Sequence, residues 1–422
     1  MKRALFLVSL LCASGCHSCG SGGDAGKVDG APSASASAQA LAANGKPSAL
    51  SLPFASAMAK EGIYVAGLVV ERKAINLSRY TLDGRVEWSI DVMDDVRWTS
   101  TSELWVFAGE GGEVVALRGQ RGDKSVQIAR SVDASGNMLS EPFDVASHPC
   151  ATFDALYWTE KLPGGGTGVK RRALAGGAAT SATEEKDSND VSLACGDKQV
   201  FLLEDNDESF AVQRLETSKA TVVASDDGDD EPKDRPAFTV GDDLGVLVVT
   251  TVGRMQLRFP ALGTPRTLRK LTDEEDLVAV DADGKRALVV YTRDDPDRCG
   301  SDGLVSDVRA LDVPLDGTKE IDEEVARGAC DVDLGPFWIG SASGKMLVAW
   351  EERDAKKKKG GAPVTGLGYR VLGDAAPTHL PQSAEDLAFA GCSATKCYVV
   401  ALERPAGTDG MVPGSAKLIS FP

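Results

Sequence analysis

The sequence offers little from which an imidazole-based active site could be built, because only three histidines occur among its 422 residues. It also has fewer positive than negative charges: 46 lysines and arginines and 63 aspartates and glutamates give a net charge of −17. Such a chain repels phosphate backbones, which argues against nucleic acid as a partner. Helical periodicity is almost absent beyond residue 50, and no apolar run is long enough to span a bilayer. A mostly β protein that folds in water is therefore indicated.

The N-terminus has the pattern of a secretion signal. Lys2 and Arg3 precede a short apolar run at residues 4–11. The next four residues, Ala-Ser-Gly-Cys ending at Cys16, resemble the lipobox of bacterial lipoproteins, with Ala13 where leucine is commoner. The resemblance implies a signal peptide at residues 1–15 and a lipid anchor on Cys16. Ordinary cleavage near Ala13 and a signal anchor are the alternatives.

The lipobox resemblance also implies a location and a membrane attachment. His17 stands where aspartate would signal retention at the inner membrane, so we expect an outer-membrane lipoprotein facing the periplasm or the cell surface. Residues 20–50 consist mainly of Gly, Ala, Ser and Pro and contain no aromatic residue. Such a composition cannot bury enough apolar surface to offset its ordering entropy. We therefore expect residues 16–50 to be a lipidated, disordered tether before a domain at residues 51–422.

Short apolar strands entered through tight polar turns recur along this domain. Their spacing of 41 to 59 residues is close to that of a four-stranded propeller blade. The fourth unit is the clearest, with strands expected at 191–194, 200–203, 210–215 and 221–224. The repeated second strands are centred on eight positions: Tyr64, Trp105, Tyr157, Phe201, Leu247, Leu288, Leu347 and Tyr398. Eight such positions predict eight units.

One unit carries a resemblance to a known type of propeller. The segment YTLDGRVEW at residues 80–88 is similar to the repeat of quinoprotein-type propellers, and the overall pattern resembles uncharacterised secreted propellers of Gram-negative bacteria. We use this likeness for the fold only, because Asp-Gly before a strand is general hairpin chemistry. The expected fold is an all-β propeller of seven to eight four-stranded blades after the tether, and two β-sandwiches are the alternative.

Six cysteines in the domain predict three disulfides, because an exported protein folds in an oxidising compartment. Cys392 and Cys397 end and begin neighbouring strands of one hairpin. The other two pairs follow from equivalent places in the repeat: Cys150 with Cys195 near the ends of first strands, and Cys299 with Cys330 in loops of one face. A metal site is not expected, since the domain contains no Cys-x-x-Cys pair and no histidine at ligand spacing.

The repeat also predicts which face binds. Loops between second and third strands and between blades share one face and carry the long insertions, whereas the turns of the opposite face are tight. The acidic stretch at 226–231 would permit calcium, although its spacing matches no EF-hand. The candidate binding residues on the long-loop face are Glu160, Asp226, Asp229, Asp294, Asp297, Glu351 and Glu403.

Two classes of function remain open after these steps. The first is a membrane-anchored propeller of the cell envelope that binds a protein or a glycan and uses no cofactor. The second is a propeller enzyme, either a glycoside hydrolase with two carboxylates near the axis or a quinoprotein-like dehydrogenase. His148 and His379 have no Ser or Cys in an arrangement resembling a triad, and no catalytic residue is assigned.

Overall fold

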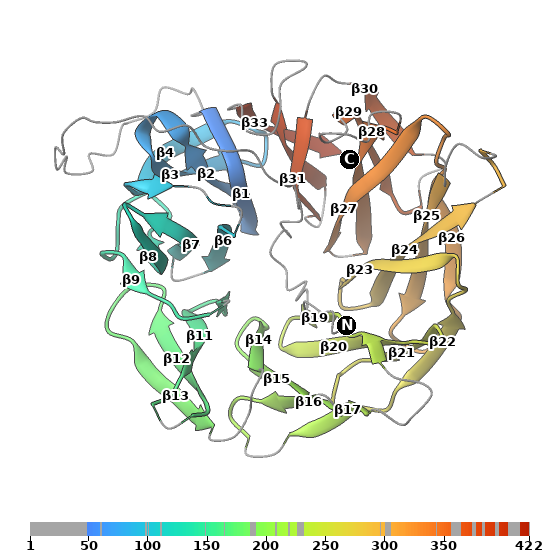
Figure 1. Ribbon diagram of the computed structural model, residues 1–422, viewed down its shortest axis with the longest axis horizontal. Coiled ribbons are helices and arrows are strands. Elements are labelled where there is room, and N and C mark those ends of the chain that lie inside the picture. Colours follow the sequence, from blue (N-terminus) through green and yellow to red (C-terminus); the bar gives the residue numbers. More distant parts are fainter. Residues whose placement is uncertain are drawn as a thin grey trace.

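The computed structural model describes residues 49–421, except 60, 98, 100, 110–111, 148, 164, 186–190, 207–208, 218–219, 226–231, 296, 300–304, 343, 356–363, 374–376, 382–384, 393–395 and 404–413. The predicted signal peptide and nearly all of the predicted tether lie outside these residues. Seven antiparallel sheets form the eight blades of a closed propeller ring, because one sheet runs from the last blade into the first (Figure 1). The predicted propeller is therefore confirmed, with eight blades.

The first four blades contain strands β1 to β17. A 3₁₀ turn, η1 (Val70–Arg72), follows the second strand of blade 1. The strands are β1 (Ala49–Ala59), β2 (Gly62–Val69), β3 (Ala74–Thr81) and β4 (Val86–Met93) in blade 1; β5 (Val96–Arg97), β6 (Glu103–Gly109), β7 (Gly112–Arg121), β8 (Lys124–Val132) and β9 (Phe143–Asp144) in blade 2; β10 (Cys150–Ala151), β11 (Ala155–Lys161), β12 (Thr167–Ala173) and β13 (Thr180–Glu185) in blade 3; and β14 (Val191–Cys195), β15 (Val200–Asn206), β16 (Ser209–Arg214) and β17 (Thr221–Ser225) in blade 4.

The remaining blades contain β18 to β33. They are β18 (Pro232–Asp234), β19 (Ala237–Val240), β20 (Asp243–Thr250), β21 (Arg254–Arg258) and β22 (Arg266–Lys270) in blade 5; β23 (Glu275–Ala282), β24 (Arg286–Asp295), β25 (Val305–Pro314) and β26 (Ile321–Ala326) in blade 6; β27 (Val332–Ala342), β28 (Lys345–Asp354), β29 (Val364–Val371) and β30 (Thr378–Pro381) in blade 7; and β31 (Glu385–Cys392), β32 (Cys397–Glu403) and β33 (Gly414–Phe421) in blade 8. The start of β1 pairs with β33 as the fourth strand of blade 8.

The core lies between blades rather than at one centre. Eight hydrophobic clusters each join two neighbouring blades, one cluster at each of the eight interfaces. Second strands are covered on both faces, so β2 and β20 read as continuous apolar runs. The cluster between blades 8 and 1 packs β1, β2 and β3 against β32 and β33. This contact closes the ring between the two ends of the domain. The C-terminal strand therefore lies beside blade 1, as the repeat predicted.

Two details of the repeat differ from the prediction. Trp105 lies on β6, the inner strand of blade 2, and not on a second strand. The second strand of that blade is β7, because Gly112 allows a hairpin immediately after β6 at a φ of 129°. The second detail concerns residues 210–215, whose alternating sequence predicts a strand covered on one face only. Phe210, Ala211, Val212 and Gln213 are all buried, because β16 is packed between two blades.

The three predicted disulfides are confirmed: Cys150–Cys195, Cys299–Cys330 and Cys392–Cys397. Their partners are 45, 31 and 5 residues apart in sequence. In the chain-entropy model a disulfide stabilises by about 2–4 kcal/mol, and more for longer loops. Removing Cys150–Cys195 should therefore lower the free energy of unfolding most, and removing Cys392–Cys397 least. Denaturant titrations of paired Cys→Ala variants measure the order; equal losses for all three would contradict it.

Candidate binding face

The two faces of the ring are built differently. We call the face with the loops between second and third strands and between blades the first face, and the opposite side the second face. On the second face, β14 and β15 are joined by residues 196–199 and β23 and β24 by residues 283–285. On the first face, 9 residues separate β24 from β25 and residues 355–363 separate β28 from β29. The predicted difference in loop length is thus present in blades 6 and 7 but not all round the ring. Only two residues join β7 to β8 and β15 to β16 on the first face, whereas residues 133–142 join β8 to β9 on the second face.

Hydrogen bonds link second-face hairpins of neighbouring blades. The Phe153 N–H of blade 3 donates to Asp197 O of blade 4, and the Asp197 N–H donates to Gly241 O of blade 5, both at 2.8 Å. The Asp242 carboxylate accepts the N–H of Lys198 at 2.6 Å. A side chain at Gly196 would approach Gly241 O to 2.4 Å, so this contact requires glycine. Blades 3 to 5 are therefore fastened together at their second-face ends.

The same fastening continues through blades 6 to 8. The Arg286 guanidinium of blade 6 donates to Gly344 O of blade 7 at 2.7 Å. The Ser341 hydroxyl lies 2.7 Å from Ala282 O across the same interface. In blade 8 the Cys392–Cys397 disulfide links the two strands of the β31–β32 hairpin. A surface whose turns are short and mutually bonded has few conformations with which to adapt to a partner.

The predicted binding residues that the structure describes lie at the first-face ends of their blades, but it does not gather them into one site. Glu160 is paired with Lys170 within blade 3 at 3.1 Å. Asp294 accepts the Ser306 hydroxyl within blade 6 at 2.5 Å, and the Asp297 side chain is exposed in the following loop. Glu351 is buried and bound by Arg353 within blade 7. Asp226 and Asp229, and the side chain of Glu403, lie outside the described residues.

An ordered arginine anchors the first-face loop of blade 6. Both guanidinium Nη atoms of Arg298 donate to the Asp307 carboxylate at 2.6 Å, and Gly328 N–H donates to the same carboxylate at 3.0 Å. The Cys299–Cys330 disulfide lies next to this pair. Burial tends to raise the pKa of Asp307, but the hydrogen bonds from Arg298 and Gly328 outweigh it and hold that pKa below its usual range. The sequence showed the charged loop but not this partner, which lies across the β24–β25 hairpin.

Exposed carboxylates concentrate where blades 5, 6 and 7 meet the first face. The residues before and at the start of β23 and β27 reach solvent, while Glu275 among them is buried and paired with Arg269. The exposed basic residues of the same region are Lys233, Arg254, Lys270, Arg293 and Arg327. The exposed acidic residues, which we call the acidic rim, are Asp273, Glu274, Asp276, Asp331 and Asp333. This part of the first face therefore exposes both signs of charge, with its carboxylates gathered before and at the start of β23 and β27.

His379 on β30 belongs to a separate pair at the outer side of blade 7. Its Nδ1 lies 2.5 Å from Glu352 Oε1, and its ring meets the buried Trp350 edge-on at a centroid distance of 6.3 Å. The side chain is about half exposed. Within the described part of the chain, no group of three or more His, Cys, Asp or Glu side chains could hold a metal ion.

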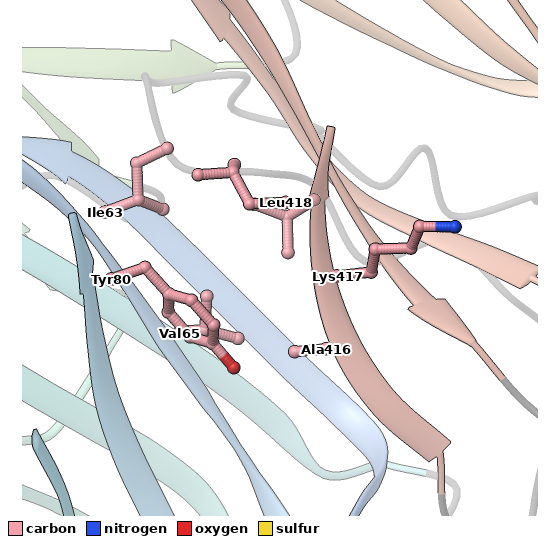
Figure 2. A pocket seen from close by; sticks show the side chains of 7 residues that line it. Ile63, Val65, Tyr80, Ala416, Lys417 and Leu418 are labelled. Atoms are coloured by element: carbon pink, nitrogen blue, oxygen red, sulfur yellow. The ribbon is translucent and has the colours of Figure 1, made fainter. Parts of the chain in front are cut away.

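An apolar crevice lies at the seam between blades 1 and 8 (Figure 2). The Tyr80 hydroxyl is buried there without a hydrogen-bond partner, and burial raises the pKa of Tyr80 to about 12. The crevice is too narrow to hold a water molecule, so it is a packing seam and not a ligand site. Its other lining residues are Ile63, Val65, Val400, Ala416, Lys417 and Leu418.

Comparison with known proteins gives the fold and no closer relation. The sequence matches no family model and no curated protein. A prolyl endopeptidase is similar in structure, with a TM-score of 0.51 and 11% identity over 85% of this chain and 55% of that one. Oligogalacturonate lyase in complex with manganese is similar with a TM-score of 0.50 and 11% identity, over 86% of this chain and 99% of that one. The chain spans about half the length of the prolyl endopeptidase. At such identities the likeness shows a β-propeller and nothing finer.

Proposed function

We propose that this protein is a lipid-anchored binding module of the cell envelope that holds a protein or a glycan on its first face. The observation that carries the proposal is the difference between the two faces. The second face is fastened from blade to blade by hydrogen bonds such as Asp197 N–H to Gly241 O. The first face combines long loops with a rigid support, which is the usual arrangement of a binding surface on a β scaffold.

The acidic rim indicates the chemistry of the partner. Its exposed carboxylates create a negative surface that attracts a basic protein surface and repels nucleic acid. Neutral glycans would use hydrogen bonds instead and would be insensitive to salt. We therefore favour a partner protein with a basic surface, bound in a salt-dependent way. A propeller enzyme acting on glycans is the competing function.

A binding screen separates these functions. The full-length protein is tested against basic and acidic proteins, glycans and chromogenic glycosides at two salt concentrations. Reversal of two rim charges, in Asp273→Lys with Asp331→Lys, should weaken binding at least tenfold. The matched second-face control is Glu216→Lys with Asp316→Lys, which should bind as the unmodified protein does. Turnover of a glycoside that one carboxylate substitution abolishes would overturn the binding-only function.

The anchor rests on the sequence pattern that ends at Cys16, which lies outside the described residues. No helix among the described residues is long and apolar enough to cross a membrane. We expect the unmodified precursor to be processed at Cys16 and the product to enter the detergent phase on phase separation. The Cys16→Ala protein should be released or misprocessed, because the substitution removes the thiol that would carry the acyl chains. If the Cys16→Ala protein stays membrane-bound with unchanged mobility, the anchor assignment is wrong.

A further inference from the structure

Blades 6 and 7 meet near the ring axis through one carboxylate and one hydroxyl. Asp281 lies on β23, the inner strand of blade 6, one residue before the second-face hairpin. Ser341 lies on β27, the inner strand of blade 7. The Ser341 Oγ lies 2.8 Å from Asp281 Oδ2 and 2.7 Å from Ala282 O. The two contacts come from adjacent residues of blade 6 and meet one side-chain atom of blade 7.

These two contacts need two hydrogens, but the Ser341 hydroxyl has one. A carbonyl oxygen is only an acceptor, and so is an ionised carboxylate. With Asp281 ionised, Ser341 can donate to Asp281 or to Ala282 O, and the other pair of oxygens faces each other without a proton. With a proton on Asp281 Oδ2, the carboxylic acid donates to Ser341 Oγ and Ser341 donates to Ala282 O. Both short contacts are then hydrogen bonds.

We propose that the joint between blades 6 and 7 is proton-linked: Asp281 carries a proton when the joint is closed, and its ionisation loosens the joint. The Ala282 N–H donates to Asp281 Oδ1 at 2.8 Å and the Ser341 backbone N–H also reaches the carboxylate. These donors orient Asp281 in either protonation state. The proposal does not depend on what the first face binds.

The charges around Asp281 act in the same direction. Asp283, in the same hairpin, is a second carboxylate beside it and has one buried oxygen without a partner. Two cations belong to this hairpin. Lys285 is exposed, and Arg286 on β24 is engaged with Asp312 on β25 and with Gly344 O on blade 7. Asp242 in the neighbouring hairpin of blade 5 accepts N–H groups of blade 4. No cation is therefore directed at Asp281 among the charged groups that the structure describes around it.

The sign of the pH effect follows from burial. Burial raises the pKa of Asp281 from 3.8 to about 6, and the negative charge of Asp283 adds to this rise. A raised folded-state pKa means that the unfolded chain loses the proton first as pH increases. The joint is therefore fully stabilised below about pH 4, and this stabilisation is lost as the pH rises through about 6.

The substitution Asp281→Asn tests the joint, because the amide N–H₂ donates to Ser341 Oγ as the protonated acid does but never ionises. Unfolding is followed by denaturant titration from pH 4 to pH 8 in the full-length protein. The variant should unfold like the unmodified protein near pH 4. At pH 7 the unfolding equilibrium constant of the variant should be about 100-fold smaller than that of the unmodified protein, as follows from a pKa difference of about two units. The control Asp123→Asn changes an exposed carboxylate and should show no such growth.

A second measurement reports the proton itself. Infrared difference spectra between the unmodified protein and Asp281→Asn at pH 5 should contain a carboxylic-acid carbonyl band that disappears by pH 7.5. Ser341→Ala should lower the stability more at pH 5 than at pH 7.5, because it removes both hydrogen bonds of the closed joint. A titration of Asp281 near pH 4, or an Asp281→Asn effect that is the same at every pH, would overturn the proposal.

Discussion

Deleting residues 417–422 is expected to unfold the whole domain. Strand β33 pairs with β32 along its length, from Cys397 opposite Phe421 to Glu403 opposite Ser415. Leu418 packs in the cluster that joins blades 8 and 1, and Ile419 packs in the cluster between blades 7 and 8. Fully burying an aliphatic side chain is worth about 1.5–3 kcal/mol, and these two partly buried side chains contribute somewhat less each. Together with the lost strand pairing, this removes most of the roughly 5–15 kcal/mol by which a domain is stable.

The matched control for the deletion is removal of residues 20–45 from the expected tether, which should leave the thermal unfolding temperature unchanged. Both proteins are compared by thermal denaturation and by resistance to limited proteolysis. The deletion at the C-terminus should abolish the cooperative transition or expose the whole ring to the protease. An unchanged transition after that deletion would show that β33 is not needed to close the ring, and would contradict the fold account.

The substitution Asp307→Ala should destabilise the protein by about 2 kcal/mol, because it removes the two 2.6 Å hydrogen bonds of the Arg298 guanidinium and leaves it the longer contacts with Asp295 and Gly328 O. It also frees Gly328 N–H, which lies close to the Cys299–Cys330 disulfide. Chemical denaturation measures the loss of stability, and hydrogen exchange measures the loosening of the first-face loop of blade 6. Asp297→Ala is the control in the same loop, since that side chain is exposed and should change stability by less than about 0.5 kcal/mol.

The Asp307 effect should also depend on pH in a defined direction. The folded-state pKa of Asp307 is held below its usual range, so its stabilisation is present above about pH 4 and is lost as the pH falls through the lower folded value. The difference between the unmodified protein and Asp307→Ala should therefore be constant from pH 5 to pH 8 and shrink below pH 4. A difference that grows on acidification would contradict the Arg298 pairing.

The sequence alone predicted the repeat and the cysteine pairing because both depend on local spacing. Second strands such as β15 begin with a continuous apolar run, here residues 200–203, because both faces are covered, and this run is visible without a structure. Cys392 and Cys397 fall opposite each other in one hairpin, so their pairing follows from the turn length. The prediction for blade 2 was wrong because a tight hairpin at Gly112 follows β6 directly. The strand around Trp105, expected to be the second strand, is therefore the inner strand of the blade.

The candidate site could be predicted only as a face. Which loops lie together follows from the order of strands, and Glu160, Asp294 and Glu351 do lie at the first-face ends of their strands. Their hydrogen-bond and ion-pair partners depend on which side chains meet across strands. The spacing of residues in the sequence does not predict these contacts. The partly buried contact between Ser341 and Asp281 is of this kind, because the two residues are 60 positions apart and on different blades.

The central claim, that the first face is the binding side, can be tested in cells without knowing the partner. A photo-crosslinking amino acid is placed at position 273 or 331 on the acidic rim, or at position 216 or 316 on the second face. Irradiation of cells that produce the full-length protein should give higher-mass adducts from positions 273 and 331, and raised salt during irradiation should reduce them. Positions 216 and 316 should give none. Adducts from the second face alone, with none from the acidic rim, would contradict the account.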